Sequence, residues 1–356
     1  MNKLLFTLSD VFCDSIEGNY ENINQAELLG YICTNRITGI AFKNMYKCSV
    51  RWQKECKDVL ETMYKKNVQK SKLFKRFVCE LASILKKAEF KYVLLKGAYL
   101  STLLYEEGMR TSNDIDILIQ EKDIEKCQHL LESNGFTQGY IEEGKKIRPA
   151  SRREIIMSRM NYGETVPFVK IIDDELLEID INFSLDFKPE QGVSRVKQLL
   201  EKREQVIFED STYYTLNQYD FFIHLCCHLY KEATTINWVR MGRDLQLYKF
   251  SDINLFFRKV LASLDIDTLV KRIKEYQTEE ECYYTIVNAS QIYPQIVELD
   301  FYNHLIQDIE PENLEFMKQI VSPETGEKYF YDMSFEDWFF AEDKIRFLNK
   351  VIMFGE

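Results

Sequence analysis

This chain contains few of the residues that interrupt helices. It has 6 Pro and 13 Gly among 356 residues, and Pro149 is the first proline. A β-protein of this length needs many more turns containing Gly and Pro, so long helices should dominate the fold. Apolar residues make up 46% of the chain and charged residues 29%, which is the balance of a folded globular protein and not of a disordered one.

Apolar residues recur at helical spacing toward both ends of the chain. The pattern is clear at Phe74, Phe77, Val78, Leu81 and Leu85 and weaker over 25–45. It returns after residue 189, most clearly over 218–232 and 238–250. We therefore expect an N-terminal helical region at 1–90 and a C-terminal helical domain at 189–356.

The middle segment, 91–188, shows short apolar runs that alternate with helical stretches. The expected strands are 92–95, 114–119, 166–172 and 176–185, and the expected helices are 98–105 and 122–134, the second of them stopped by Gly135. Residues 138–163 are polar and predict a loop with one short helix. The predicted fold class is α+β and mostly helical, with a small mixed-sheet core between helical regions.

Charge and cysteine content narrow the class of protein. The chain has 46 Lys and Arg against 57 Asp and Glu, a net charge of −11, which argues against a surface built to wrap nucleic acid. Its nine Cys include no CxxC pair, which favours reduced thiols and a cytoplasmic location. No apolar run is long enough to span a bilayer, so we expect no membrane partner.

Two predicted strands each carry acidic residues at alternate positions. Asp114 and Asp116 share one face of the first, and Glu178, Asp180 and Asn182 share one face of the second. Carboxylates on one face repel each other unless a cation lies between them, and Mg²⁺ with substrate phosphates is a natural partner. The alternative is that these residues form a solvated polar face. The strand ending at Lys96-Gly97 favours the first interpretation, because a helix start there can meet a phosphate.

Three motifs together resemble a known family. They are Leu94-Leu95-Lys96-Gly97-Ala98, the stretch from Gly108 to Ile119 with sequence GMRTSNDIDILI, and the stretch from Asp180 to Leu185 with sequence DINFSL. They are similar to the uncharacterised bacterial nucleotidyltransferases of the DNA polymerase β superfamily. A weaker similarity covers His224 to His228 with Trp238, Arg243 and Asp244. Asn182 stands where that family commonly has His, and Ala98 where the wider superfamily has Ser.

The resemblance implies a mechanism and a set of site residues. Asp114, Asp116 and Asp180 would be the catalytic residues and would hold two Mg²⁺, for which Mn²⁺ could substitute. The nucleotide, expected to be ATP, would contact Lys96, Gly97, Ser101, Arg110 and Ser112. An acceptor group would attack the α-phosphorus of the triphosphate and release pyrophosphate.

Several points stay open at the level of sequence. Glu178 is either an extra metal ligand or base, or a solvent-exposed residue. His224 and His228 share a helix face and are packing residues, contacts to nucleotide or acceptor, or metal ligands. The basic residues between Lys145 and Arg159 either bind phosphates or form a solvated face. The acidic balance favours a small-molecule, peptide or protein acceptor over nucleic acid, and a catalytically silent nucleotide-binding protein is the alternative function.

Overall fold

The computed structural model describes residues 1–16, 23–48, 50–144, 146–162, 165–184 and 195–350. Their contacts divide the chain into two units, each assembled from separate segments. Unit 1 comprises Met1–Ile37, Asn44–Trp52 and Phe222–Glu356, and unit 2 comprises Thr38–Lys43 and Gln53–Phe221. The division into 1–90, 91–188 and 189–356 stays a prediction, and its second boundary lies outside the described residues.

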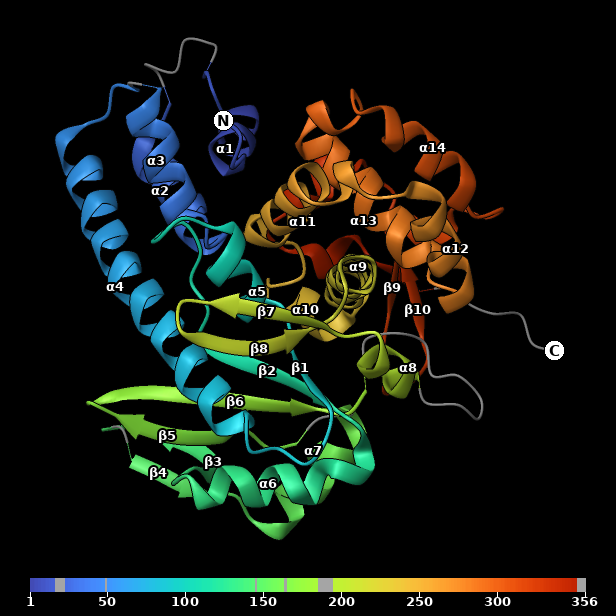
Figure 1. Cartoon of the computed structure of the whole chain (residues 1–356). Coiled ribbons are helices and arrows are strands. Elements are labelled where there is room, and N and C mark those ends of the chain that lie inside the picture. The colour runs from blue at the N-terminus through green and yellow to red at the C-terminus, as the bar shows by residue number, and fades with distance from the viewer. Residues whose placement is uncertain (17–22, 49, 145, 163–164, 185–194, 351–356) are drawn as a thin grey trace. The chain divides into compact units, whose positions relative to one another are not determined.

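Unit 2 is built around a six-stranded mixed sheet. Its strands are β1 (Tyr92–Leu94), β2 (Asp114–Ile119), β3 (Thr137–Glu142), β4 (Lys146–Pro149), β5 (Phe168–Ile172) and β6 (Glu175–Asn182), in the order β1-β2-β6-β5-β3-β4 (Figure 1). Strands β2 and β6 are parallel, whereas the other pairs are antiparallel. The tight turn between β5 and β6 has positive φ angles at Asp173 and Asp174, as a two-residue type I′ turn requires.

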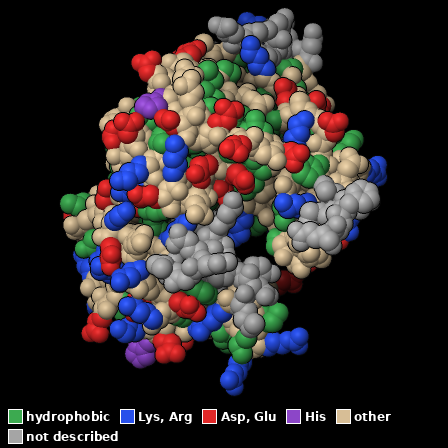
Figure 2. Space-filling view, turned by 90° about the vertical axis from the view of Figure 1, so that its right-hand side faces the viewer, with side chains coloured by type: hydrophobic (Ala, Val, Ile, Leu, Met, Phe, Trp, Pro, Cys, Tyr) green, Lys and Arg blue, Asp and Glu red, His purple; other side chains and the backbone are tan. Residues whose placement is uncertain are grey.

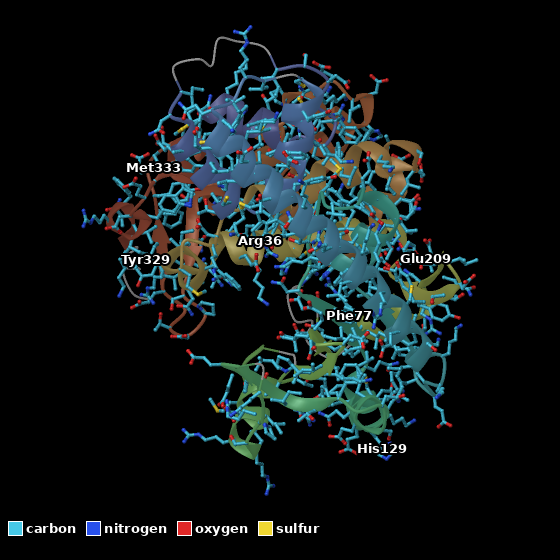
Figure 3. The ribbon with its side chains drawn as sticks, turned by 90° about the vertical axis from the view of Figure 1, so that its left-hand side faces the viewer. Arg36, Phe77, His129, Glu209, Tyr329 and Met333 are labelled. Atoms are coloured by element: carbon cyan, nitrogen blue, oxygen red, sulfur yellow. The ribbon has the colours of Figure 1, made fainter. Side chains whose placement is uncertain are left out.

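Helices surround this sheet within unit 2. They are α4 (Lys54–Leu85), α5 (Gly97–Tyr99), a π-helical turn (Leu100–Leu104), α6 (Ile124–Ser133), α7 (Arg152–Tyr162) and α8 (Arg195–Glu201). Helix α4 buries an apolar stripe that includes Leu81 and Phe77, the second of which is labelled in Figure 3, as the spacing predicts. Gly135 ends α6 with a φ of +83°, a conformation that glycine adopts without strain.

The four predicted strands of the core are present, but the strands at the far edge of the sheet were not predicted. The short helix expected within 138–163 is present as α7, but the loop expected before it is wrong, because β3 and β4 form a hairpin there. Only Gly139 among the residues of these two strands is buried. A hairpin that stays in contact with water needs no apolar run, so the usual sequence signal of a strand is missing.

A second hairpin in unit 2 also departs from the predicted helix-only region after 189. It consists of β7 (Glu204–Phe208) and β8 (Ser211–Thr215). The Thr215 hydroxyl donates to the carbonyl of Leu94 at 2.9 Å. Tyr213 and Thr102 share a buried hydroxyl–hydroxyl hydrogen bond of 2.7 Å. This hairpin therefore fastens the end of β1 and the turn that follows it.

Unit 1 is mostly helical. Its helices include α1 (Asn2–Ser9), α2 (Gln25–Thr34), α10 (Ile236–Arg240), α11 (Leu247–Lys259), α12 (Ile266–Tyr276), α13 (Glu279–Ile292), α14 (Asp300–Ile309) and α15 (Phe335–Phe340). Helices α3 (Thr38–Lys47) and α9 (Gln218–Thr234) begin in unit 2 and end in unit 1. A small sheet is formed by β9 (Gln319–Val321), β10 (Lys328–Phe330) and β11 (Asn349–Lys350). The core contains Phe222, Phe250, Phe256 and Trp338, and Trp338 stacks on Tyr331 with ring centroids 4.0 Å apart.

Two expectations about unit 1 need correction. The predicted helix over 238–250 is two helices, α10 and α11, because the chain turns at Gly242, whose φ is +62°. The helical stretch over 25–45 is likewise interrupted between α2 and α3 at Arg36, whose φ is +57°. The predicted fold class is confirmed: the protein is α+β and mostly helical with a small mixed sheet. Among the described helices, none combines the length and the apolar character needed to cross a membrane.

Candidate active site

The acidic residues of β2 and β6 lie side by side on one face of the sheet. In the parallel register, Asp116 is level with Asp180 and Asp114 is level with Glu178. Level residues on parallel strands point to the same face, and adjacent strands are about 4.8 Å apart. The structure therefore brings together the three aspartates that the sequence predicts to act together, with Glu178 as a fourth carboxylate.

The alternating burial of these strands explains why the acidic face is turned outward. Ile115 and Ile117 on β2 and Ile179 and Ile181 on β6 are each no more than 1% exposed, and they point to the opposite face. A one-residue slip of either strand would bury the carboxylates and expose the isoleucines, so the apolar face fixes the register.

Two polar neighbours contact Asp116. The Lys96 ammonium lies 3.7 Å from Asp116 Oδ2, and the two side chains are 21% and 15% exposed. The Asn182 amide donates to Asp116 Oδ1 at 3.3 Å and to the carbonyl of Asp180 at 3.5 Å. Asn182 thus links the two level aspartates, although its residue type departs from the family pattern.

The other level pair, Asp114 and Glu178, has its negative charge less well balanced by neighbouring groups. Burial and the nearby Asp116 carboxylate raise the pKa of Asp114, while the Lys96 ammonium acts in the opposite direction. Burial and the Asp114 carboxylate also raise the pKa of Glu178. Asp114 nevertheless keeps contact with solvent, and Glu178 is half-buried. This face therefore favours the binding of positive charge.

A short turn after β1 brings the predicted nucleotide-binding residues together. A Cβ placed on Gly97 would lie 2.4 Å from Ser112 Oγ and 3.3 Å from Arg110 Nη1. The Arg110 guanidinium in turn donates to the Ser112 hydroxyl. The absence of a side chain at Gly97 is therefore what lets the segment before β2 approach the turn after β1.

Lys96 itself has an unusual backbone. Its φ is +35°, which a residue with a side chain rarely adopts. The turn is held by backbone hydrogen bonds, from Leu95 N to the Asp116 carbonyl and from Leu100 N to the Lys96 carbonyl, both 3.0 Å. In contrast, Ser101 is only 2% exposed and its hydroxyl has no hydrogen-bond partner among the described residues, so it does not reach the acidic face in this conformation.

The carboxylates have the chemistry of a magnesium site but are not closed around one. Among the described residues, no three Asp, Glu, His or Cys side chains are gathered tightly enough to enclose a metal ion. Instead, Lys96 and Asn182 contact Asp116. Oxygen ligands from several carboxylates on adjacent strands are nonetheless the donor set that Mg²⁺ and Mn²⁺ accept.

The predicted histidines belong to unit 1. His224 is 2% exposed, and its ring centroid lies 6.3 Å from that of His228, as residues four apart on α9 should be. His228 Nε2 lies 3.4 Å from the carboxylate of Glu232, which also pairs with the Lys249 ammonium. Sequence reasoning did not find this charge pair, because Glu232 and Lys249 come from different helices.

The basic residues before residue 160 are partly neutralised. Arg148 forms ion pairs of 3.1 Å with Glu142 and 3.0 Å with Glu154, and it stacks on the Tyr140 ring. Lys145 lies outside the described residues. On the face in Figure 2, basic side chains are interspersed with acidic ones. These observations favour the solvated interpretation for Arg148.

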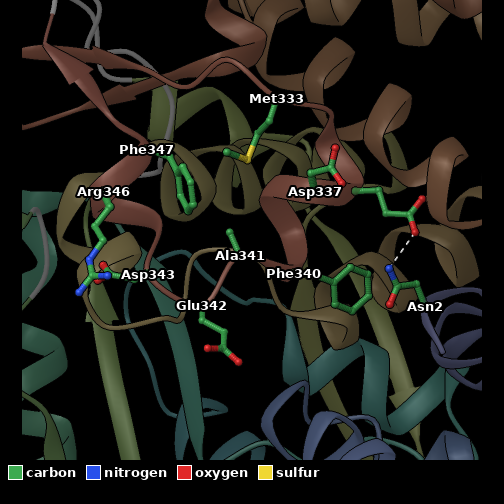
Figure 4. A pocket seen from close by; sticks show the side chains of 10 residues that line it. Asn2, Met333, Asp337, Phe340, Ala341, Glu342, Asp343, Arg346 and Phe347 are labelled. Carbon is green, nitrogen blue, oxygen red and sulfur yellow. Dashed lines mark hydrogen bonds and ion pairs between the residues drawn. The ribbon is translucent and has the colours of Figure 1, made fainter. Parts of the chain in front are cut away.

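The pocket in Figure 4 lies wholly within unit 1 and contains none of the predicted site residues. Its volume is about 460 Å³, and its lining includes Met333, Phe340 and Phe347. Asn2 donates to Glu336 at its rim, over a distance of 3.0 Å. The acidic face of unit 2 is therefore not recognised by the size of a cavity; it is recognised by the chemistry of its side chains.

Comparison with known proteins places the chain in a class of nucleotidyltransferases. It belongs to the uncharacterised nucleotidyltransferase family, whose model matches residues 21–294. This match confirms the family resemblance indicated by the motifs. A crystal structure of an antigenic nucleotidyltransferase-like protein from Paracoccidioides brasiliensis is similar at 15% identity, with a TM-score of 0.39, over 63% of this chain and 90% of that one. No curated protein matches the chain.

Proposed function

We propose that this protein is a Mg²⁺-dependent enzyme that moves a nucleoside monophosphate from a nucleoside triphosphate to an acceptor hydroxyl and releases pyrophosphate. The observation that carries the proposal is the level pairing of Asp116 with Asp180, beside Asp114, on one face of the sheet. Membership of a nucleotidyltransferase family supports the reaction class. ATP is the expected nucleotide.

Asp114, Asp116 and Asp180 are the residues that would hold two Mg²⁺, with Mn²⁺ as a substitute. When bound, the metal ions would neutralise charge on the triphosphate and polarise the phosphoryl oxygens. Asp180 would accept the proton of the acceptor hydroxyl. The hydroxyl oxygen forms a bond to the α-phosphorus as the bond from that phosphorus to the bridging oxygen breaks, and pyrophosphate leaves with both electrons of that bond.

The turn after β1 would hold the β- and γ-phosphates. Lys96 and Arg110 supply positive charge, and the contact of Gly97 with Ser112 fixes the distance between their backbones. Ser101 does not contribute a hydroxyl in this conformation, since it is buried. Phosphate binding would therefore depend on Lys96, Gly97, Arg110 and Ser112.

For the acceptor, we propose a small molecule or a peptide or protein side chain. The net charge of −11 supports this choice, since an RNA or DNA acceptor needs concentrated positive charge. The mixture of acidic and basic side chains in Figure 2 agrees with it. The cytoplasm, where ATP and Mg²⁺ are both abundant, is the proposed location.

Transfer of radioactive label tests the proposal. Incubation of the protein with α-labelled ATP, Mg²⁺ and a small-molecule or protein fraction should produce a labelled acceptor and pyrophosphate. Asp180→Asn should reduce this transfer by about 100- to 1,000-fold. Asp174→Asn is the matched control, because it makes the same exchange in the β5–β6 turn, where Asn tolerates a positive φ, and it should retain activity.

The result also separates the two candidate functions. Equal labelling by the wild-type protein and Asp180→Asn would contradict the proposed reaction. Nucleotide binding without transfer to any fraction would favour the catalytically silent alternative, which Ala98 and Asn182 allow as departures from the family pattern.

A further inference from the structure

We propose that Lys96 occupies the cation position of the acidic face in the metal-free protein, and that the phosphates of a bound nucleotide draw it away. Divalent metal and nucleotide would then bind cooperatively at this site, each favouring the other. This inference rests on the proposed function, because it assumes that the same face receives both ligands. It adds a mechanism that prevents the metal from binding firmly before the nucleotide arrives.

The position of the Lys96 ammonium is the first observation. It lies 3.7 Å from Asp116 Oδ2, and both side chains are largely shielded from solvent. The same ammonium also acts on Asp114, where its charge opposes the rise in pKa that burial and the Asp116 carboxylate cause. A metal ion held by Asp114 and Asp116 would have to take the place of this ammonium, because two cations at one carboxylate pair repel strongly in a shielded site.

The backbone at Lys96 is the second observation. Its φ of +35° is a strained conformation for lysine, yet hydrogen bonds of the turn on either side maintain it. Strain of this kind persists where the surrounding structure demands it, and it is concentrated at functional sites. Here it fixes the start of a long, flexible side chain at the edge of the acidic face, while the ammonium remains able to rotate to another anion.

The neighbours of Lys96 supply the third observation. Gly97 follows it in the chain, and Gly97 is in close contact with Ser112 and Arg110. A triphosphate bound by Arg110 and Ser112 would therefore lie within a short distance of Lys96. Its phosphates would offer the ammonium a new partner, and Asp116 would become available to the metal. The metal ion competes with the Lys96 ammonium for Asp116, and the nucleotide draws that ammonium away. Binding of one ligand therefore favours binding of the other.

Binding of Mn²⁺ tests the inference without any measurement of turnover. Mn²⁺ affinity is measured by electron paramagnetic resonance for the wild-type protein and for Lys96→Met, without nucleotide. Lys96→Met should bind Mn²⁺ about 10-fold more tightly, since no ammonium competes. Lys96→Arg keeps the charge and should bind Mn²⁺ as weakly as the wild type. Lys96→Gly removes the charge and suits the positive φ, so it should behave like Lys96→Met even if the methionine variant folds poorly.

The same titrations with α,β-methylene-ATP measure the coupling. The wild-type protein should show about 10-fold mutual tightening beyond the chelation of Mn²⁺ by the free nucleotide, and Lys96→Met should lose most of it. Equal or weaker Mn²⁺ affinity in Lys96→Met and Lys96→Gly would overturn this inference while the proposed function stands. Absence of Mn²⁺ binding from every protein, with or without nucleotide, would contradict the proposed function and the inference with it.

Discussion

Two charged clusters of this protein, one in each unit, differ in burial and in how their charges are balanced. In unit 1, the Glu232 carboxylate pairs with the Lys249 ammonium and lies 3.4 Å from His228 Nε2. The same ammonium lies 5.8 Å from the centre of the Trp238 ring. Glu232 and Lys249 are only 7% and 6% exposed, so this cluster is buried and its charges are matched.

On the acidic face of unit 2, four carboxylates lie together, from Asp114, Asp116, Glu178 and Asp180. Lys96 forms an ion pair with Asp116, and the charges of Lys96 and Arg110 act on Asp114. A matched buried cluster holds helices together, and removal of one partner is costly. A partly exposed cluster of neighbouring carboxylates repels itself, and a bound cation relieves that repulsion. The difference indicates that the first cluster serves the fold and the second serves binding.

The largest expected effect comes from breaking the matched cluster. Lys249→Met leaves the buried Glu232 carboxylate without its ammonium, so the free energy of unfolding should fall by about 3–5 kcal/mol. Urea denaturation followed by circular dichroism measures the change. The double variant Lys249→Met with Glu232→Gln should recover part of the loss, because no buried charge remains. A loss below about 1 kcal/mol in the single variant would show that the pair is not essential to unit 1.

A smaller effect is expected at the turn beside the acidic face. In Gly97→Ala, the new Cβ would lie 2.4 Å from Ser112 Oγ, so the Ser112 side chain must shift and its contact with Arg110 is disturbed. We expect a loss of about 1–2 kcal/mol in the free energy of unfolding and about 10-fold weaker binding of ATP, measured by calorimetry. Gly30→Ala on α2 is the matched control, since a Cβ there meets nothing within 4 Å. Unchanged ATP affinity in Gly97→Ala would separate this turn from nucleotide binding.

Relief of repulsion on the acidic face should be visible as a gain in stability. Burial and the Asp116 carboxylate raise the pKa of Asp114 in the folded state, so folding favours the protonated form of this side chain. The stabilisation from that proton is fully present below the unfolded pKa and is lost as pH rises through the raised folded pKa. Asp114→Asn should therefore raise the Tm of the metal-free protein at pH 8 by about 2 °C, and by less at pH 5. Differential scanning calorimetry at both pH values checks this. A lower Tm of Asp114→Asn at pH 8 would mean that neighbouring cations balance the Asp114 carboxylate, as Lys249 balances Glu232.

The smallest effect concerns a matched pair that is exposed. Arg148 and Ser151 lower the pKa of Glu154 to about 2. Because the folded pKa is depressed, the contribution of Glu154 is present above its usual pKa and is lost as pH falls toward 2. Once the intrinsic pH dependence of amide hydrogen exchange is divided out, the protection of the amides at the start of α7 should fall over that range in the wild type and stay constant in Glu154→Gln. Constant protection in the wild type would show that exposure cancels the pairing.

The alternation of residues was enough to predict which side chains share a face. Asp114 and Asp116, and likewise Glu178 and Asp180, lie two apart on strands whose other face is buried isoleucine, and that pattern is local in the sequence. The level pairing of Asp116 with Asp180 is not local. It depends on the parallel contact of β2 with β6, which the family resemblance implied but no local pattern determines.

The contacts of Lys96 and the edge hairpins show where local patterns fail. The ion pair of Lys96 with Asp116 and the close contact of Gly97 with Ser112 join residues that become neighbours only when the sheet forms. Strands β3 and β4 carry no apolar run, because most of their residues remain in contact with water. The break at Gly242 was missed because the apolar spacing continues on both sides of it.

Mn²⁺ binding in the presence of α,β-methylene-ATP decides whether the acidic face of unit 2 is a two-metal site. The acidic face should bind two Mn²⁺ per chain, as two-metal sites for phosphoryl chemistry do, and the double variant Asp116→Asn with Asp180→Asn should bind no more than the nucleotide itself chelates. The same Mn²⁺ stoichiometry and affinity in the wild type and the double variant would show that Asp116 and Asp180 do not hold the metal ions.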